Sequence, residues 1–291
     1  MIEKKAYAKI NLFLDIEKLR GDGYHNIKSV MQTIDWFDVI QVKKGIYDGI
    51  KITSNDKRLP TDSSNIVFRA ARAFLNELDI NEGIDIYVEK SIPVSAGMAG
   101  GSADGAATLE ALNELYGFPF TTDELVKIGK NIGADIPFCI RGGTKKIGGI
   151  GDLMVDTSPM PECIILCAKM PDAGVSTPQA YKELDNIYCD FVGYNYSREK
   201  LDGLIESMAA GDIKEMCENM FNIFEEAIAV EHSSVNQIKS IMKNYGAIKA
   251  MMSGSGPSVF GIFENESDAE LACKDLKSKG AKAKICHPIA K

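Results

Sequence analysis

Residues 93–104, PVSAGMAGGSAD, form the segment of this chain whose composition is best suited to bind phosphate. Glycine lets the backbone approach a ligand closely and adopts positive φ at no steric cost. From Ser102 onward the sequence predicts a helix with leucines on one face and Gly117 at its end. The free N–H groups and the positive dipole end of such a helix start bind anions. The segment predicts a phosphate-binding loop, with a loop that serves helix packing alone as the alternative.

Two common nucleotide-binding motifs are absent from the sequence. It holds no GxxxxGK[ST] and no GxGxxG, and no lysine follows the glycines of the loop. A lysine that acts on a transferred phosphate must therefore come from elsewhere, and Lys9 in AYAKINLFLDI is the best candidate. This segment predicts a strand that carries Lys9 and Asn11 on the face opposite Ile10 and Leu12. A solvated strand face is the alternative, because lysine is mostly exposed.

Asp135 in NIGADIPFCIRGG is the third candidate for chemistry. It follows a predicted helix with Thr122 as its N-cap and Gly133 at its end. The apolar run 136–140 comes directly after it, and a buried carboxylate without a partner is costly. Asp135 is therefore predicted either to pair with Lys9 and a substrate hydroxyl, or to serve only as a helix-end or turn residue.

Five segments, in this order, resemble the motifs of the GHMP kinase superfamily. They are AYAKINLFLDI, RGDGYHNIKSVMQTID, IPVSAGMAGGSADGAATLEALNELYG, IGADIPFCIRGG and MMSGSGPSVFGIF, and they span Tyr7 to Phe263. RGDGYH and AGGSAD most resemble the branch whose substrate is 4-diphosphocytidyl-2-C-methyl-D-erythritol. The resemblance implies an ATP-dependent kinase that phosphorylates the 2-hydroxyl of this compound in the methylerythritol phosphate route to isoprenoid precursors.

The resemblance also implies roles for the candidate catalytic residues. Asp135 is expected to orient the substrate hydroxyl and accept its proton, while Lys9 keeps Asp135 ionised and offsets negative charge. Asn11 is expected to hydrogen-bond the methylerythritol hydroxyls. ATP and Mg²⁺ are the implied cofactors. Gly101 stands where other members carry a magnesium-binding serine, so no metal ligand is identified.

For the cytidine end, the resemblance points to Tyr24 and His25 in RGDGYH. An aromatic ring stacks on a base with little regard to its identity, so His25 would supply the specificity. The segment AGVSTPQAY resembles the part of the family that supplies a threonine and a second aromatic residue, here Thr177 and Tyr181. Tyr24 and Tyr181 are then expected to sandwich the cytosine.

For ATP, the resemblance implies a larger set of residues around the phosphate loop. Lys90 and Asn65 are both expected near the nucleotide. The alternative for Lys90 is an exposed lysine at a strand end, and the alternative for Asn65 is a residue that only caps a helix. A second small-residue loop, 253–258, is expected to close on the phosphates and on the first loop, or to be only a turn between strands. The expected nucleotide-binding residues are Asn65, Lys90, Pro93, Val94, Ser95, Ala96, Gly97, Met98, Ala99, Gly100, Gly101, Ser102 and Ala103.

Composition sets bounds on function. With 291 residues, 45% of them hydrophobic, the chain can bury two cores. A net charge of −8 without a basic, aromatic-interleaved stripe argues against a nucleic-acid binder. No apolar run approaches the ~20 residues of a membrane span and no leader is visible, so a cytoplasmic protein, by default a monomer, is expected. Seven scattered cysteines without a CxxC pair predict neither disulfides nor zinc.

The order of predicted elements favours an α+β protein with the two-domain GHMP kinase fold. A proline-rich segment near Thr157 divides it into an N-terminal domain, 1–158, and a ferredoxin-like C-terminal domain, 159–291. Two other functions are open at this point. A homoserine or mevalonate-type kinase is disfavoured by RGDGYH, and a silent binding protein is disfavoured by Lys9, Asp135 and both small-residue loops.

Overall fold

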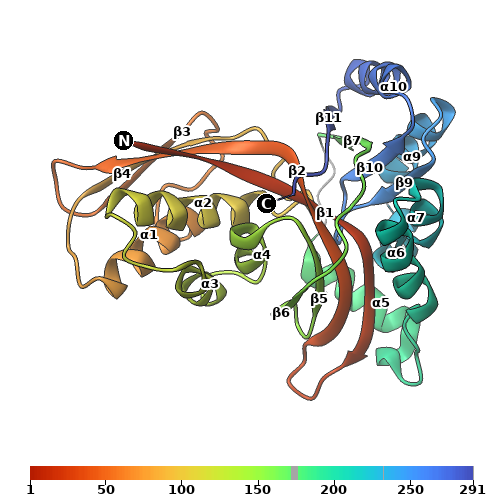
Figure 1. The fold of residues 1–291 in the computed structure, drawn as a ribbon, viewed down its shortest axis with the longest axis horizontal. Helices are drawn as coiled ribbons and strands as arrows, with labels where there is room; N and C mark the ends of the chain where they lie inside the picture. The colour runs from red at the N-terminus through yellow and green to blue at the C-terminus, as the bar shows by residue number, and fades with distance from the viewer. Residues whose placement is uncertain (172–175, 232, 291) are drawn as a thin grey trace. The chain divides into compact units, whose positions relative to one another are not determined.

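The computed structural model describes residues 1–171, 176–231 and 233–290, which form two compact units. The first unit contains residues 1–8, 36–94 and 99–142, and the second contains 9–35, 95–98 and 143–291. Strands β1 (Ile2–Leu19) and β2 (His25–Lys44) are long enough to contribute to both units (Figure 1). The units are therefore discontinuous in sequence, and a division into 1–158 and 159–291 stays a prediction.

In the first unit, strands and helices form two layers (Figure 1). β3 (Ile50–Ser54) lies parallel to β4 (Ile84–Glu89), which pairs antiparallel with β2. Buried side chains of these strands and of the helices form one core that includes Ile86, Phe74 and Leu109. The helices are α1 (Ile66–Glu77), α2 (Gly100–Leu115), α3 (Thr122–Lys130) and α4 (Ile136–Arg141).

Local signals explain where these helices begin. The N-cap of α3 is Thr121, which exchanges hydrogen bonds with Glu124 in a capping box, so the predicted cap at Thr122 is wrong by one residue. α2 begins at Gly100, two residues earlier than predicted, because Ala99 adopts a left-handed conformation that ends the loop there. The apolar run after Asp135 forms the short helix α4.

In the second unit, three short strands extend the sheet of β1 and β2, two of them by pairing with these strands directly. β8 (Phe221–Asn222) lies parallel to β1, with Phe13 opposite Phe221. β5 (Thr144–Gly148) pairs antiparallel with β2, and β6 (Leu153–Asp156) pairs with β5.

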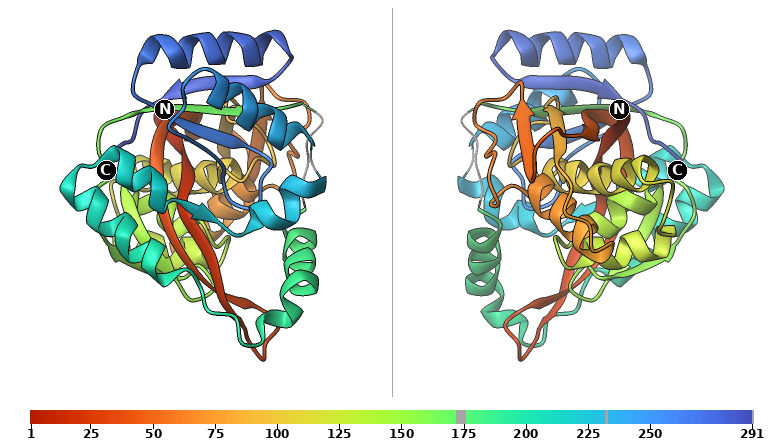
Figure 2. Two further views of the ribbon diagram at one scale, coloured as in Figure 1. Left: turned by 90° about the vertical axis from the view of Figure 1, so that its right-hand side faces the viewer. Right: turned by 90° about the vertical axis from the view of Figure 1, so that its left-hand side faces the viewer.

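A separate four-stranded antiparallel sheet lies in the same unit. Its order is β11 (Lys282–Cys286), β7 (Ile164–Lys169), β10 (Val259–Phe263), β9 (Lys249–Met252). α9 and α10 pack against this sheet, and the order confirms the ferredoxin-like β-α-β-β-α-β plan with inserted helices (Figures 1 and 2). The helical segments are α5 (Thr177–Tyr188), η1 (Cys189–Phe191), α6 (Arg198–Ala210), α7 (Ile213–Asn219), α8 (Phe224–Glu231), α9 (Ser233–Asn244) and α10 (Glu266–Ser278).

The predicted α+β class is confirmed. Within the described ranges, no helix has the length and apolar character needed to cross a membrane. None of the seven cysteines, all of which lie in those ranges, forms a disulfide.

Candidate active site

The glycine-rich loop connects β4 to α2 with a contorted backbone. Ser95, Gly97 and Ala99 adopt φ of 50°, 71° and 55°, so every second residue is left-handed. Non-glycine residues in this region cost free energy and occur at ligand-binding segments. Ala99, the N-cap of this 16-residue helix, makes no side-chain capping hydrogen bond to the first N–H groups of α2. The arrangement suits an anion, as the sequence predicts.

The second small-residue loop packs directly on the first. Ser253 Oγ donates to the carbonyl of Gly97 over 3.0 Å. Asn222, which is buried, donates from Nδ2 to the carbonyls of Met252 and Gly254 at 2.8 and 2.9 Å. The predicted contact between the two loops is confirmed, and Asn222 fixes the position of the second one.

Lys9 and Asn11 point to the same side of β1 and contact each other. Lys9 Nζ donates to Asn11 Oδ1 over 2.6 Å, Asn11 Nδ2 donates to Ser29 Oγ, and Ser29 donates to the carbonyl of Phe13. Only 4% of Lys9 is exposed, so the alternative of a solvated strand face is wrong. The backbone N–H of Lys9 also donates to the carbonyl of Met98, which links this strand to the phosphate loop.

Asp135 lies at the N-cap of α4 and is partly exposed. Its side chain makes no capping hydrogen bond, so the carboxylate is not used to terminate the helix. Asp135 belongs to the first unit and Lys9 to the second, and their pairing stays a prediction.

The RGDGYH segment forms the turn between β1 and β2. The Arg20 guanidinium binds both carboxylate oxygens of Asp22, and the Arg20 N–H donates to the carbonyl of Tyr24. Tyr24 is 61% exposed, which leaves its ring accessible. The RGD residues therefore hold the turn from which Tyr24 projects.

His25 is buried in a polar and aromatic environment. Its Nε2 lies 2.7 Å from Asp185 Oδ1, and because a carboxylate accepts, Nε2–H donates. The imidazole stacks on Tyr181 with ring centroids 5.0 Å apart, and Phe191 meets it edge-on at 5.6 Å. Sequence reasoning missed Asp185, although its position four residues after Tyr181 places both on one face of α5.

Thr177 opens α5 and is exposed, and its Oγ1 lies 2.9 Å from Ser255 Oγ in the second small-residue loop. Residues 173–175 of the segment AGVSTPQAY lie outside the described ranges.

Lys90 is not the exposed lysine of the alternative interpretation. Its side chain is 5% exposed and its Nζ donates to Asp38 and, over 2.5 Å, to Asp104 Oδ2. Sequence reasoning did not identify either carboxylate as a partner of Lys90. Asn65 accepts a hydrogen bond from the N–H of Val67, which confirms the helix-cap interpretation without testing a role toward ATP.

Asp104 couples stability to pH, because burial, followed by the nearby charge of Asp38, raises its pKa to about 8. An unfolded aspartate has a pKa near 4, so between about pH 4 and pH 8 the folded state holds the extra proton. Binding of this proton by Asp104 stabilises the folded state. The contribution to the free energy of unfolding is fully present below about pH 4 and is lost as the pH rises through about 8.

We expect the free energy of unfolding of the wild type to fall relative to Asp104→Asn between pH 5 and pH 8. The decline should approach about 1.4 kcal/mol per pH unit, because asparagine has no proton to lose. Urea denaturation at pH 5, 6.5 and 8 measures it, with Asp156→Asn, at a carboxylate that is 90% exposed, as the control. A wild-type-to-variant difference that stays constant with pH would contradict the prediction.

The described residues contain no group of three or more His, Cys, Asp or Glu side chains suited to hold a metal ion. Magnesium in kinases is commonly bound by one or two carboxylates together with substrate phosphates.

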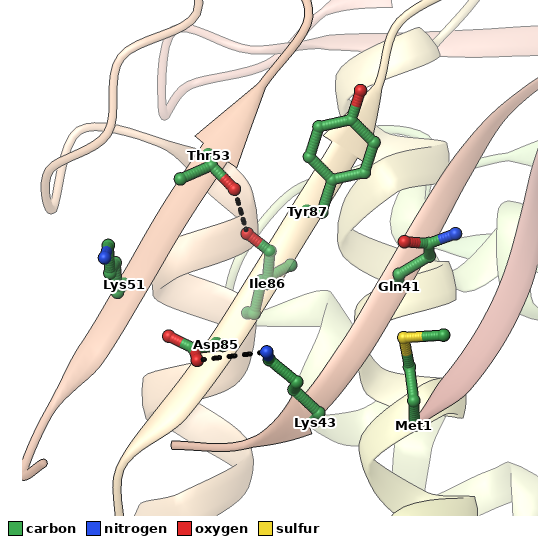
Figure 3. A pocket seen from close by; sticks show the side chains of 8 residues that line it. All are labelled: Met1, Gln41, Lys43, Lys51, Thr53, Asp85, Ile86 and Tyr87. Atoms are coloured by element: carbon green, nitrogen blue, oxygen red, sulfur yellow. Dashed lines mark hydrogen bonds and ion pairs between the residues drawn. The ribbon is translucent and has the colours of Figure 1, made fainter. Parts of the chain in front are cut away.

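A cavity of about 270 Å³ lies elsewhere in the first unit, between side chains of β2, β3 and β4 (Figure 3). Lys43 and Asp85 form an ion pair of 3.8 Å in its wall, and Thr53 donates to the carbonyl of Ile86. None of the predicted site residues lines it.

Two family models match the chain. "GHMP kinases N terminal domain" matches residues 65–143, and "GHMP kinases C terminal" matches residues 204–282. The first match includes the phosphate loop and Asp135, and the second includes the second small-residue loop.

Curated proteins and solved structures are similar over nearly the whole chain. The 4-diphosphocytidyl-2-C-methyl-D-erythritol kinases of Clostridium acetobutylicum and Caldicellulosiruptor saccharolyticus are 42% and 41% identical to it. These alignments cover 98% and 94% of this chain and 99% and 92% of the relatives. A crystal structure of 4-(cytidine 5'-diphospho)-2C-methyl-D-erythritol kinase superposes over 100% of both chains with a TM-score of 0.81 at 25% identity. The homoserine kinase of Cytophaga hutchinsonii shares the fold, with a TM-score of 0.76 at 20% identity. This superposition covers 99% of this chain and 94% of the homoserine kinase.

Proposed function

This chain belongs to the 4-diphosphocytidyl-2-C-methyl-D-erythritol kinases within the GHMP kinase superfamily, and from that membership we propose that it transfers the γ-phosphate of ATP to the 2-hydroxyl of 4-diphosphocytidyl-2-C-methyl-D-erythritol. It is a phosphotransferase with an alcohol acceptor, and this step belongs to the methylerythritol phosphate route to isoprenoid precursors. The observation that carries the proposal is the near-full-length similarity to these kinases, and the buried Lys9 beside the phosphate loop agrees with it.

The phosphate loop and the start of α2 are the proposed binding site for the phosphates of ATP. The N–H groups at the start of α2 and the helix dipole stabilise negative charge on the phosphates. Phosphoryl transfer passes through a loose transition state with dispersed charge, so positioning and electrostatic stabilisation supply most of the catalysis. Mg²⁺ would enter as the ATP complex and neutralise charge on the phosphate oxygens.

The reacting hydroxyl requires an acceptor for its proton and compensation for negative charge. We assign the first role to Asp135, whose carboxylate is not used as a helix cap. We assign the second to Lys9, whose ammonium is held in place by Asn11. Asn11 is the proposed partner of the methylerythritol hydroxyls.

The cytidine group is proposed to bind at Tyr24 and His25. Because Asp185 accepts from Nε2–H of His25, a neutral ring presents Nδ1 as an acceptor, which matches the amino group of cytosine. The exposed ring of Tyr24 supplies a stacking surface. Thr177 and Tyr181 are proposed to complete this part of the site. A monomeric state and a cytoplasmic location stay predictions.

The proposed function is tested by measuring ADP release with ATP and magnesium against a panel of alcohols. The panel contains the diphosphocytidyl substrate, its analogue without cytidine, homoserine and mevalonate. Turnover confined to the diphosphocytidyl compound supports the proposal. Turnover with another alcohol would reject the substrate, and no turnover with any of them would favour a protein that only binds nucleotide.

Tyr24→Ala is expected to raise the KM for the diphosphocytidyl substrate about 10-fold with a smaller change in kcat. Stacking on an aromatic ring contributes about 1–3 kcal/mol per base, and the loss falls on binding. Tyr24→Phe retains the ring and serves as the matched control. Steady-state kinetics at saturating ATP measure the effect, and an unchanged KM in Tyr24→Ala would exclude the stacking role.

A further inference from the structure

Three buried charged side chains lie next to the phosphate loop without a role in the chemistry proposed above. Lys90 follows β4, Asp38 lies in β2 and Asp104 lies in the first turns of α2, and all three belong to the first unit. Their side chains are 5%, 0% and 1% exposed. Charged groups are rarely buried to this degree unless they are paired, so the cluster has a specific structural task.

One end of the loop is held by Asp38. Its Oδ1 accepts from the backbone N–H of Ser91 and, over 2.7 Å, from that of Ile92. These two residues lead from β4 into the loop. The indole N–H of Trp36 donates to the carbonyl and the hydroxyl of Ser91 at 3.1 and 3.0 Å, so the entrance is fixed from β2 by a second side chain.

The other end of the loop is held through Asp104. Its Oδ2 accepts from Lys90 Nζ, while its Oδ1 is buried without a hydrogen-bond partner in the described parts of the chain. A Cβ on Gly100, the first residue of α2, would lie 3.1 Å from the Ile92 side chain and 3.7 Å from Lys90 Nζ. The start of α2 therefore packs against the loop entrance and against the lysine itself.

We propose that Lys90, Asp38 and Asp104 form a positioning cluster that fixes both ends of the phosphate loop, so that Lys90 acts on ATP through the loop backbone and not by contact. This inference rests on the proposed function. The cluster carries a formal charge of zero while Asp104 holds its proton and of −1 when all three groups are ionised, so in neither state does it offer excess positive charge to a phosphate. Its contribution lies in the placement of the loop N–H groups, which depends on the geometry of both ends.

The test is a double-mutant cycle on Asp38→Asn and Lys90→Met, read as the KM for ATP, the KM for the alcohol substrate, and the Kd for a non-hydrolysable ATP analogue by calorimetry. Each single variant is expected to raise the KM and Kd for the nucleotide about 10-fold or more, with the KM for the alcohol within about twofold of wild type. In the double variant, the KM and Kd for the nucleotide are expected to be no higher than in the more strongly affected single variant, because the groups act as a unit.

The opposite result identifies a contact role. If Lys90 binds ATP directly, Asp38→Asn releases its ammonium and nucleotide affinity stays the same or rises, while Lys90→Met weakens it. That pattern overturns the proposal. Folded single variants with wild-type KM and Kd for the nucleotide but lower melting temperatures overturn it as well, because the cluster would then be purely structural.

Two further variants secure the interpretation. Asp104→Asn keeps the side-chain shape and leaves one lysine facing one aspartate, so it serves if the other variants do not fold. Faster hydrogen exchange at the loop amides in this variant is expected, and unchanged exchange with unchanged Kd overturns the proposal.

Arg58→Met removes an exposed ion pair with Asp56 in the same unit and is the matched control. Calorimetry with the ATP analogue needs no alcohol substrate. The Kd values therefore test the positioning role even if the alcohol substrate proposed above is incorrect.

Discussion

Replacement of Asp135 by asparagine is expected to lower kcat by about 1,000-fold, within the range of general acid–base effects, while the Kd for ATP changes less than about threefold. Asparagine has nearly the same shape as aspartate, but it cannot accept the proton of the substrate hydroxyl. The loss therefore falls on the chemical step and not on binding.

The experiment measures ADP release in a coupled assay and nucleotide affinity by calorimetry. Asp123→Asn, which alters a carboxylate that is 72% exposed in the first turn of α3, is the control and should retain wild-type kcat. Lys9→Met completes a double-mutant cycle, since two groups that act as a unit lose less together than the sum of their single losses. Wild-type kcat in Asp135→Asn would exclude this residue from the reaction.

Gly97→Ala is expected to reduce kcat/KM for ATP by at least about 100-fold, which corresponds to about 2.7 kcal/mol. A Cβ at this position would overlap the carbonyl oxygen of Ser253 and lie 3.2 Å from the backbone nitrogen of Gly256. Both neighbours are backbone atoms, so neither can move aside as a side chain could. The two small-residue loops must then separate, and the N–H groups of the first lose their placement.

Gly117→Ala provides the matched control for this substitution. Gly117 has a φ of 78°, similar to the 71° of Gly97, but a Cβ there meets no atom within 4 Å. It therefore bears the same conformational cost, about 1–2 kcal/mol, without the collision. Urea denaturation and ATP kinetics separate the two effects. Equal ATP kinetics in the two alanine variants would show that the contact between the loops is not needed.

Local patterns were sufficient to predict much of the fold and part of the site. Strand alternation placed Lys9 and Asn11 on one face, and the structure shows their side chains in contact. The cap at Asn65, which was the alternative to a role toward ATP, followed from residue type and position alone. Both depend on residues close in sequence, where backbone geometry determines which side chains meet.

The parts that could not be predicted depend on contacts between distant residues. Asp38 and Lys90 are 52 positions apart, and nothing in either segment indicates that β2 and β4 bring them together. His25 and Asp185 are separated by 160 positions. The sequence showed a lysine before the loop and a histidine in a turn, but periodicity carries no information on tertiary partners. The one-residue error at Thr122 has a local cause, because Thr121 and Thr122 are both suitable caps and only the position of Glu124 distinguishes them.

The pairing of β1 with β8 has a consequence for how the chain folds as it is synthesised. Phe13 faces Phe221, so β1 leaves the ribosome about 200 residues before its partner exists. At about 5–20 residues per second, this delay is on the order of 10–40 s. During that time, one edge of the strand that carries Lys9 lacks its neighbour, and such non-local pairing slows folding. We expect a nascent chain that ends before residue 221 to depend on chaperones, even though its first 142 residues already contain every segment of the first unit.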